Sequence, residues 1–321
     1  MKKILITGAT GFVGSHLIEF ILKNHEEYEI FAAKRRRSDM DNVAHLMNND
    51  KVHWININID DYNSVETAFL ENGPFDKIFH LAAQSFVVFS WNAPTETINS
   101  NITGTLNVLE ATRKHSKDSI IQLAGSSEEY GYQEKFPLTE DLFLRPLSPY
   151  AVSKVATENL GYQYYKSYGL KTILTRAFNH EGPRRGEVFV TSTFAKQVVE
   201  IEKGLKPPVI YHGNLDSYRD YTDVRDVVRA YWIATEKCNY GEPYNICSEN
   251  LTKIEDVLNK FISMSSIKIE RKIDPERMRP SDLVKLKGDC SKFREKTNWK
   301  PVISVDQMLE DIFKYWQDKL N

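Results

Sequence analysis

The sequence predicts a doubly wound α/β fold, in which helices cover both faces of a parallel sheet, followed by a smaller mixed α/β lobe. Two observations support this prediction. Strand-like and helix-like segments alternate up to residue 178, and the strand-like segments are continuously apolar, as is typical of parallel strands that are buried on both faces. A glycine-rich turn also joins the first strand-like segment to the first helical one.

The first 178 residues are expected to contain six strands with helices between them. Short β-rich runs indicate the strands, which we place at residues 2–8, 28–34, 51–59, 75–83, 119–125 and 170–178. Helical segments separate them, and we place these helices at residues 12–24, 63–72, 93–115 and 148–169. The chain of 321 residues is long enough for one large domain or two coupled ones.

The alternation stops after residue 178. The segment from there to about residue 213 is rich in glycine, proline and charge, so we expect it to be irregular. An amphipathic helix is expected at residues 221–235 and a strand at residues 242–248. From residue 251 onward, two or three helices should surround a polar loop at residues 274–288.

These elements suggest two parts of the molecule. We expect residues 1–178 plus 219–248 to form a nucleotide-binding domain, and residues 179–218 plus 249–321 to form a smaller substrate-binding lobe. The cleft should lie at the carboxyl ends of the parallel strands, where ligands of such sheets bind.

The composition argues against several classes of protein. The formal net charge is −2 and cations are spread along the chain, so no basic face for nucleic acid is expected. No apolar stretch approaches the length of a membrane span, and glycines interrupt the N-terminal apolar run, unlike in a signal peptide. Cys238, Cys247 and Cys290 are scattered and form no CxxC pair, so we expect a reducing, cytoplasmic location.

The turn "TGATGFVG" is a candidate site for a dinucleotide. It places Gly8, Gly11 and Gly14 at three-residue intervals between strand and helix. A diphosphate needs backbone N–H groups and no Cβ atom in the way, and a glycine turn at a helix N-terminus offers both. The alternative is a tight turn needed only for packing. We predict a Rossmann-type site, with contacts that also involve Thr10, Phe12 and Val13.

The end of the second strand bears on the choice of dinucleotide. An acidic residue there would bind the ribose 2′-hydroxyl of NAD, but this sequence has "AAKRRRS", with Lys34, Arg35, Arg36 and Arg37. Cations suit the 2′-phosphate of NADP, so NADP is favoured over NAD, and Arg35 and Arg36 are predicted contacts. The alternative is a solvated basic loop.

The segment "SPYAVSKVA" carries a candidate catalytic pair. Tyr150 and Lys154 are four residues apart in a predicted helix and therefore lie on one face. An ammonium group near a phenol lowers the pKa of the phenol. Tyr150 could then exchange a proton with a substrate hydroxyl or carbonyl group while hydride moves to or from a nicotinamide.

Together these motifs resemble the extended short-chain dehydrogenase/reductase superfamily: TGxxGxxG, "HLAAQS" at residues 80–85, a hydroxyl after the fifth strand, and YxxxK. Three longer segments are more specific. Residues 178–192, 213–226 and 279–289 resemble the GDP-mannose 4,6-dehydratase family and its close relatives that act on GDP-sugars.

The resemblance implies an activity and roles for the segment "GSSEEYG". Dehydratases of this family carry a Thr-x-Glu motif at this place, and Ser126 and Glu128 fall on its positions. Tyr150 would take the C4 hydroxyl proton, and Glu128 would remove the C5 proton and help expel the C6 hydroxyl as water. For Glu129 we expect one of two situations: it raises the pKa of Glu128 by like-charge repulsion, or it faces water.

Further contacts follow from the same resemblance. For the cofactor they are Leu81, Ala82, Ala83 and His180; for the GDP-sugar they are Ser85, Asn179, Arg184, Lys196, Arg219 and Arg279. The arginines could instead form surface ion pairs. His180 precedes Glu181, but no second histidine stands at ligand spacing, so no metal site is predicted. The resemblance also implies a homodimer or homotetramer.

The product would be a GDP-4-keto-6-deoxy sugar, made from GDP-mannose or a GDP-manno-heptose with NADP regenerated internally. Two alternatives remain open. The chain could be an NAD(P)H-dependent GDP-4-keto-6-deoxy-sugar reductase or an epimerase on the same scaffold. It could also be a dinucleotide-binding protein without catalysis, although the set of Ser126, Tyr150 and Lys154 argues against this.

Overall fold

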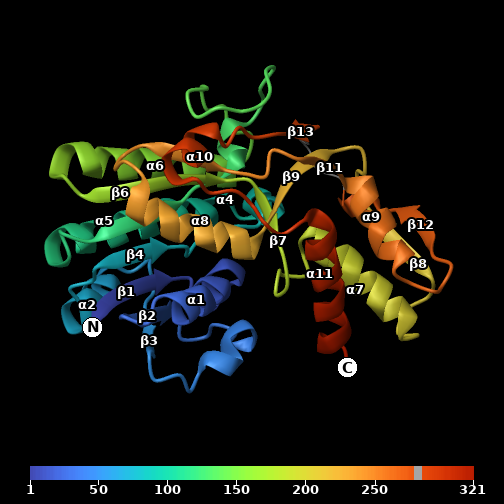
Figure 1. Cartoon of the computed structure of the whole chain (residues 1–321), viewed down its shortest axis with the longest axis horizontal. Coiled ribbons are helices and arrows are strands. Elements are labelled where there is room, and N and C mark those ends of the chain that lie inside the picture. The colour runs from blue at the N-terminus through green and yellow to red at the C-terminus, as the bar shows by residue number, and fades with distance from the viewer. Residues whose placement is uncertain (278–283) are drawn as a thin grey trace.

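A computed structural model describes residues 1–277 and 284–321 and contains one large sheet with a second, smaller assembly beside it (Figure 1). The large sheet has the strand order β10-β6-β5-β4-β1-β2-β3, and every neighbouring pair of strands is parallel. Its strands are β1 (Lys2–Thr7), β2 (Tyr28–Lys34), β3 (Val52–Asn56), β4 (Lys77–His80), β5 (Ile120–Ala124), β6 (Lys171–Ala177) and β10 (Pro243–Ile246).

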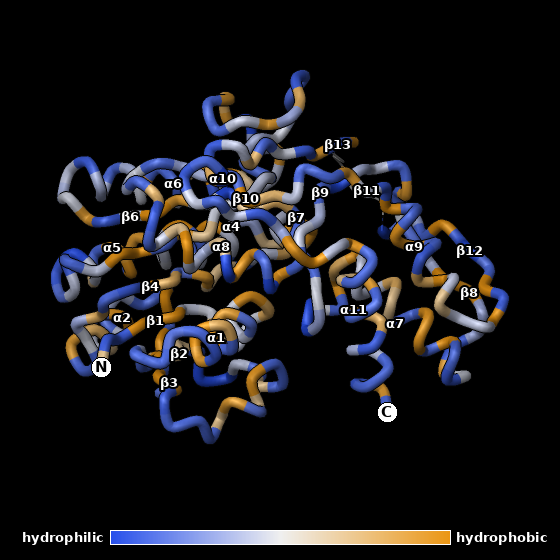
Figure 2. The backbone as a smooth tube through the Cα atoms, viewed as in Figure 1, coloured by the Kyte–Doolittle hydropathy of each residue, from blue (hydrophilic) through white to orange (hydrophobic). Residues whose placement is uncertain are grey.

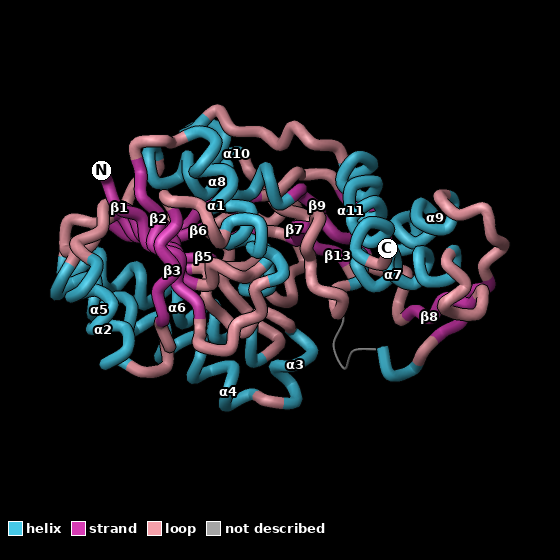
Figure 3. The backbone as a smooth tube through the Cα atoms, turned by 90° about the horizontal axis from the view of Figure 1, so that it is seen from below, coloured by secondary structure: helices cyan, strands magenta, loops and turns pink. Residues whose placement is uncertain are grey.

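Helices cover both faces of this sheet, as predicted (Figure 3). Helices α1 (Phe12–Asn24), α8 (Val224–Lys237) and α10 (Ser291–Thr297) bury their apolar sides on one face. Helices α2 (Tyr62–Asn72), α5 (Gly104–His115) and α6 (Pro149–Tyr168) cover the other face. Hydrophobic residues run along the central strands and hydrophilic residues dominate the outer loops (Figure 2), because both faces of a parallel sheet are removed from water.

The second assembly combines short strands with three helices. Strand β9 (Tyr218–Asp223) pairs with β7 (Asn179–Glu181), β11 (Leu251–Lys253) and β13 (Lys285–Leu286). Helices α7 (Val190–Glu202), α9 (Ile254–Ser263) and α11 (Val305–Lys319) share a separate apolar core. Strands β8 (Val209–His212) and β12 (Glu270–Ile273) form a parallel pair at its edge.

Most predicted elements are confirmed, but beyond residue 178 one prediction was wrong and one helix begins later than predicted. The segment at residues 178–213 is not irregular, since it contains β7, α7 and β8. The glycines, prolines and many charged residues of this segment flank the two ends of α7. Within α7, the side chains of Phe194, Val198 and Ile201 form a buried apolar stripe. The helix predicted at residues 221–235 begins only at Val224, because residues 221–223 belong to β9.

One predicted helix is interrupted. The helix expected at residues 93–115 consists of α4 (Pro94–Ile98), a π-helical turn at Asn99–Thr103, and α5. Such a turn often occurs near a functional site because it redirects a side chain. Here it carries Asn101, whose contacts reach the candidate site described below.

Candidate active site

A cavity of about 840 Å³ lies at the carboxyl ends of the parallel strands and extends to residues of the second assembly, including Arg219. This is the place that the strand order predicts. Most residues that the sequence pointed to lie on its wall, namely Gly8, Thr10, Gly11, Phe12, Val13, Gly14, Arg35, Leu81, Ala82, Ala83, Ser85, Ser126, Glu128, Tyr150, Lys154, Asn179, His180 and Arg219.

The glycine turn has a geometry that only glycine allows. Gly8 has φ +69°, and a Cβ atom there would lie 2.8 Å from the backbone nitrogen of Ala82. A Cβ atom at Gly14 would lie 2.3 Å from the Gly8 carbonyl oxygen. The turn therefore brings backbone atoms together at the start of α1, without side chains between them and a ligand. Such a cradle fits the diphosphate of a dinucleotide.

The segment after β4 is held against this turn by buried hydroxyl and imidazole groups. Thr7 Oγ1 accepts the backbone N–H groups of Leu81 and Ala82 at 3.1 and 3.2 Å. Thr7 also hydrogen-bonds His80 Nδ1 at 2.8 Å, and His80 Nε2 contacts Thr105 Oγ1 at 3.0 Å. Burial, and then the charge of Lys154, lowers the pKa of His80 to about 3, so the ring stays neutral and serves as a structural link.

The basic loop contributes one of its two predicted arginines to the cavity. Lys34 and Arg35 line the cavity together with Asn58, whereas Arg36 does not. The backbone N–H of Arg35 donates to Ser38 Oγ at 2.9 Å, which turns the loop back toward η1 (Asp41–Leu46). Of the two predicted arginines, Arg35 is therefore the one on the cavity wall.

The segment after β5 forms a short 3₁₀ turn, η3 (Ser127–Tyr130), with a capping box. Ser126 Oγ accepts the backbone N–H of Glu128 at 3.2 Å, and the Glu129 carboxylate accepts that of Ser126 at 2.6 Å. This pairing satisfies two N–H groups at the start of the turn. Ser126 and Glu128 consequently lie on the cavity wall.

Glu129 does not face water, so that expectation was wrong. Its side chain is fully buried, and its carboxylate lies 3.8 Å from Arg176 Nε. A Cβ atom at Gly125 would lie 2.6 Å from its Oε1, so the glycine makes room for this carboxylate. Burial and then the charge of Glu158 raise the pKa of Glu129, and Arg176 opposes this shift. Two adjacent glutamates thus have different surroundings.

Tyr150 and Lys154 lie on the inner face of α6, and both are buried. Lys154 Nζ donates to the Ala124 carbonyl at 2.7 Å and lies 5.8 Å from the centroid of the Tyr150 ring. Burial lowers the pKa of Lys154 to about 8, with Glu129 acting in the opposite direction.

The pKa of Tyr150 differs from the expectation. It is raised to about 12, because burial outweighs the hydrogen bond with Ser126, which lowers it. The charges of Glu129 and Glu128 raise it further, and the charge of Arg185 lowers it. Lys154 does not produce the expected net decrease, since its hydrogen bond goes to Ala124. Ser126 and Arg185 are the groups that favour the phenolate.

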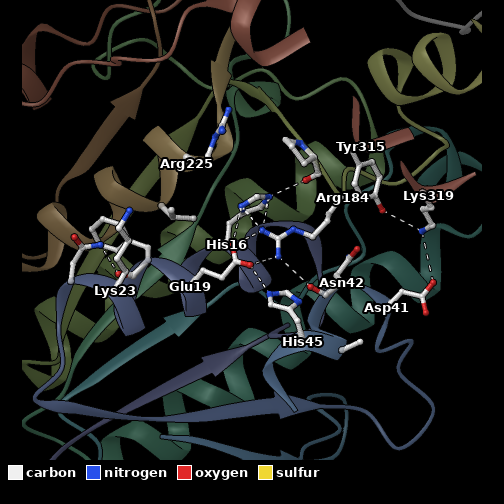
Figure 4. Close-up of a pocket in the computed structure, with 15 residues that line it drawn as sticks. His16, Glu19, Lys23, Asp41, Asn42, His45, Arg184, Arg225, Tyr315 and Lys319 are labelled. Atoms are coloured by element: carbon white, nitrogen blue, oxygen red, sulfur yellow. Dashed lines mark hydrogen bonds and ion pairs between the residues drawn. The ribbon is translucent and has the colours of Figure 1, made fainter. Parts of the chain in front are cut away.

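Arg185 lines the cavity, whereas the adjacent Arg184, which was the predicted substrate contact, does not. The guanidinium carbon of Arg185 lies 3.4 Å from the centroid of the Phe189 ring and 5.0 Å from that of Phe12. Its Nε lies 3.5 Å from Glu181. Arg184 lines a separate cavity of about 880 Å³, where it binds Glu19 (Figure 4). Of these two arginines, Arg185 is therefore the one on the wall of the large cavity.

One further predicted substrate contact, Lys196, is not brought to the cavity. Lys196 lies on α7 and pairs with Glu187, so it does not line the wall. Arg279 lies outside the described residues. Arg277, which the sequence analysis did not select, lines the cavity, as does Asn179. Within the described chain, Asn179 Oδ1 is buried without a hydrogen-bond partner.

Asn101 supports the site and was missed by the sequence analysis. Its amide donates to Ser153 Oγ at 2.8 Å and to the Gln84 carbonyl at 3.0 Å, and it accepts the Gln84 N–H at 2.8 Å. Ser153 Oγ in turn donates to the Tyr150 carbonyl at 2.6 Å. The π-helical turn therefore links the cavity segment at Gln84 to the helix that carries Tyr150. An asparagine inside a helical pattern was the only local signal.

Neither a membrane span nor a metal site was found where the structure describes the chain. No helix in residues 1–277 and 284–321 has the length and apolar character needed to cross a membrane. The same residues contain no cluster of three or more His, Cys, Asp or Glu side chains suited to a metal ion.

Known proteins resemble this chain along nearly its whole length. The model of the family described as GDP-mannose 4,6 dehydratase matches residues 5–312. A GDP-6-deoxy-D-mannose reductase from Pseudomonas aeruginosa is 28% identical, over 99% of this chain and 98% of the reductase. A GDP-mannose 4,6-dehydratase from Yersinia enterocolitica is 31% identical, over 97% of this chain and 93% of the dehydratase. The solved structure of RMD from Pseudomonas aeruginosa complexed with NADPH matches with a TM-score of 0.86 at 28% identity, over 99% of this chain and 100% of that one.

Proposed function

Since the chain belongs to the GDP-mannose 4,6-dehydratase family, we propose that it is a GDP-sugar 4,6-dehydratase. It converts GDP-mannose, or a GDP-manno-heptose, to the GDP-4-keto-6-deoxy sugar. The observation that carries this proposal is the position of Glu128 on the cavity wall beside Ser126 and Tyr150. An elimination needs a base at C5 in addition to the group that exchanges a proton at C4, and Glu128 meets that need.

The residues divide the proton transfers between them. Tyr150 takes the C4 hydroxyl proton as its phenolate, a form that Ser126 and Arg185 favour and burial opposes. Glu128 takes the C5 proton, which is acidic once C4 is a carbonyl, and returns a proton to the C6 hydroxyl as it leaves as water. Glu128 is close enough to Tyr150 for its charge to raise the pKa of the phenol. Two proton-transfer groups can therefore act on neighbouring carbons of one sugar ring.

The cofactor proposed for this cycle is NADP. When bound, it supplies the acceptor and later the donor of one hydride, so no nicotinamide is consumed. The glycine turn would hold its diphosphate, and Arg35 would meet its 2′-phosphate. The similar RMD structure is complexed with NADPH, and the choice of NADP over NAD for this chain rests on Arg35.

The GDP-sugar is proposed to bind in the part of the large cavity that extends to the second assembly. Arg185, Arg219 and Arg277 place guanidinium groups on that side of the cavity, and guanidinium groups match phosphate oxygens well. Asn179 offers an amide to the diphosphate or sugar. Residues 85–88 and Trp91 also line the cavity, and this segment, which includes helix α3 (Val87–Asn92), is where a heptose would need additional room.

Product analysis tests the proposal. The protein is incubated with GDP-mannose and a catalytic amount of NADP, and the nucleotide-sugar is analysed by mass spectrometry. The proposal expects loss of one water per sugar without net formation of NADPH. A panel that includes a GDP-manno-heptose identifies the preferred sugar. If both GDP-mannose and the GDP-manno-heptose remained unchanged even with an excess of enzyme over substrate, the proposal would be contradicted.

A second candidate is a GDP-4-keto-6-deoxy-sugar reductase. It is favoured by the Pseudomonas aeruginosa reductase, which this chain matches along 98% of the relative's length. Ser126, Tyr150 and Lys154 would suffice for a reduction, which needs no base at C5. A reductase would oxidise one NADPH for each GDP-4-keto-6-deoxymannose and would leave GDP-mannose unchanged. The two candidates therefore differ in both substrate and stoichiometry.

A further inference from the structure

Two consecutive arginines point in different directions, and the backbone between them has an unusual conformation. Arg184 has φ +73°, in the left-handed region that residues with a Cβ atom seldom adopt. This turn sends the Arg184 side chain toward α1 (Figure 4), while Arg185 lines the large cavity. A strained residue of this kind persists only when surrounding contacts hold it.

Arg184 is held mostly by contacts from one helix, α1, and it also donates to the Asn42 carbonyl at 3.3 Å. Its guanidinium group makes a two-pronged ion pair with Glu19, at 2.9 and 2.6 Å. It also hydrogen-bonds His16 Nδ1 at 2.7 Å, and His16 Nε2 contacts the Pro183 carbonyl at 2.9 Å. Burial, and then the charge of Arg184, lowers the pKa of His16 to about 3. The ring is therefore neutral, so Nδ1 accepts from Arg184 and Nε2–H donates to Pro183.

The same helix face also contacts Arg185. Phe12, His16 and Glu19 are spaced by four and three residues, so they lie on one side of α1. Phe12 packs edge-on against His16, at 5.6 Å between ring centroids, and lies under the Arg185 guanidinium group. One face of the helix that follows the glycine turn thus holds residues 183–185.

We propose that Glu19 and Arg184 are positioning residues, whose ion pair holds Arg185 on the cavity wall so that it can bind the diphosphate of the GDP-sugar. This inference rests on the GDP-sugar substrate class proposed above, but it does not depend on whether the reaction is a dehydration or a reduction. It explains why two adjacent arginines have different roles, with Arg184 positioning the backbone and Arg185 binding the ligand. Neither Glu19 nor Arg184 needs to touch the substrate.

The experiment is a double-mutant cycle read by binding, without turnover. Isothermal titration calorimetry measures the affinity of the NADP-loaded protein for GDP, in the parent and in Glu19→Gln, Arg185→Met and the double variant. We expect Arg185→Met to weaken GDP binding about tenfold or more, as loss of a charge-assisted contact does. Glu19→Gln should weaken it by a similar factor, and the double variant should bind no more weakly than Arg185→Met.

The matched control is Lys23→Gln, which changes a charge one turn farther along α1 and at the same smaller cavity. It should leave GDP binding unchanged, and NADP affinity should stay within twofold in all variants. If Glu19→Gln does not fold, Arg184→Lys, which keeps the charge but lacks the two-pronged geometry, replaces it in the cycle.

Three results would overturn the inference. The first is that Glu19→Gln leaves GDP binding unchanged. The second is that Glu19→Gln weakens GDP binding by the same factor in the parent and in the Arg185→Met background. The third is that the parent protein does not bind GDP. The last result would also remove the GDP-sugar substrate class. By contrast, GDP binding with the predicted cycle, but without dehydration of GDP-mannose, would contradict only the proposed reaction.

Discussion

The Glu129 carboxylate accepts the backbone N–H of Ser126 at 2.6 Å and is fully buried beneath the turn that carries the proposed base. Its charge opposes the burial that lowers the pKa of Lys154 to about 8. Glu128 therefore lines the cavity, whereas Glu129 accepts the Ser126 N–H and acts on Lys154 through its charge.

This relationship predicts the pH dependence of a Glu129→Gln variant. Glutamine keeps an acceptor for Ser126 but removes the charge, so the pKa of Lys154 should fall below its present value of about 8. The role proposed for Lys154 is to keep a positive charge near Tyr150, and its ammonium form is lost as pH rises through this pKa. The basic limb of the kcat/KM profile should therefore move about one unit toward lower pH.

The profile is measured between pH 6 and 10 with NADP-loaded protein. Glu140→Gln is the control, because Glu140 is a partly buried carboxylate that binds the Asn245 N–H and does not contact Ser126. An unmoved basic limb in Glu129→Gln would indicate that Glu129 carries no charge in the working range, which would contradict the prediction.

Glu128→Gln should separate binding from elimination. If Glu128 is the C5 base, the variant should bind GDP-mannose normally but dehydrate it about 10²–10⁴-fold more slowly, the usual effect of removing a general acid–base group. Single-turnover mass spectrometry gives the rate of water loss, and calorimetry gives the affinity. Dehydration at the parent rate would show that another group removes the C5 proton.

Arg35 should discriminate between the two dinucleotides. Arg35→Met is expected to weaken NADP binding about tenfold and to leave NAD binding unchanged, because only NADP has the 2′-phosphate that the cation meets. Arg36→Met is the matched control, since Arg36 does not line the cavity. Fluorescence titration with each dinucleotide measures the affinities. Equal losses for NADP and NAD would assign Arg35 to a different contact.

Gly14→Ala should damage the glycine turn directly. Its new methyl group would lie 2.3 Å from the Gly8 carbonyl oxygen, so backbone must shift, at a cost of about 1–3 kcal/mol in the free energy of unfolding. Dinucleotide affinity should fall with it. Gly186→Ala is the control, because its nearest neighbour would be at an ordinary 3.7 Å. Thermal unfolding and NADP titration are the measurements, and parent-like values for Gly14→Ala would refute the assigned geometry.

The core of the fold could be predicted because its signals are local. Continuous apolar strands, periodic helices and glycines at residues 8, 11 and 14 follow from side-chain size and backbone freedom alone. Helix α7 was missed because glycine, proline and charge at its ends obscured the stripe formed by Phe194, Val198 and Ile201. Strand β9 was missed because "YRDYTD" is polar, and its pairing with distant segments decides its conformation.

The amino-acid sequence by itself determined the strand and helix segments, the glycine turn and the spacing of Tyr150 and Lys154, since each depends on neighbours within a few residues. Only the tertiary structure decided which member of each identical pair faces the cavity. Glu128 and Glu129 differ because Arg176 and the Ser126 N–H draw Glu129 inward, and Arg184 and Arg185 differ because Glu19 holds Arg184. Except for Ser126, these partners are distant in the chain. The sequence therefore cannot show which way each side chain points, because only folding brings the partners together.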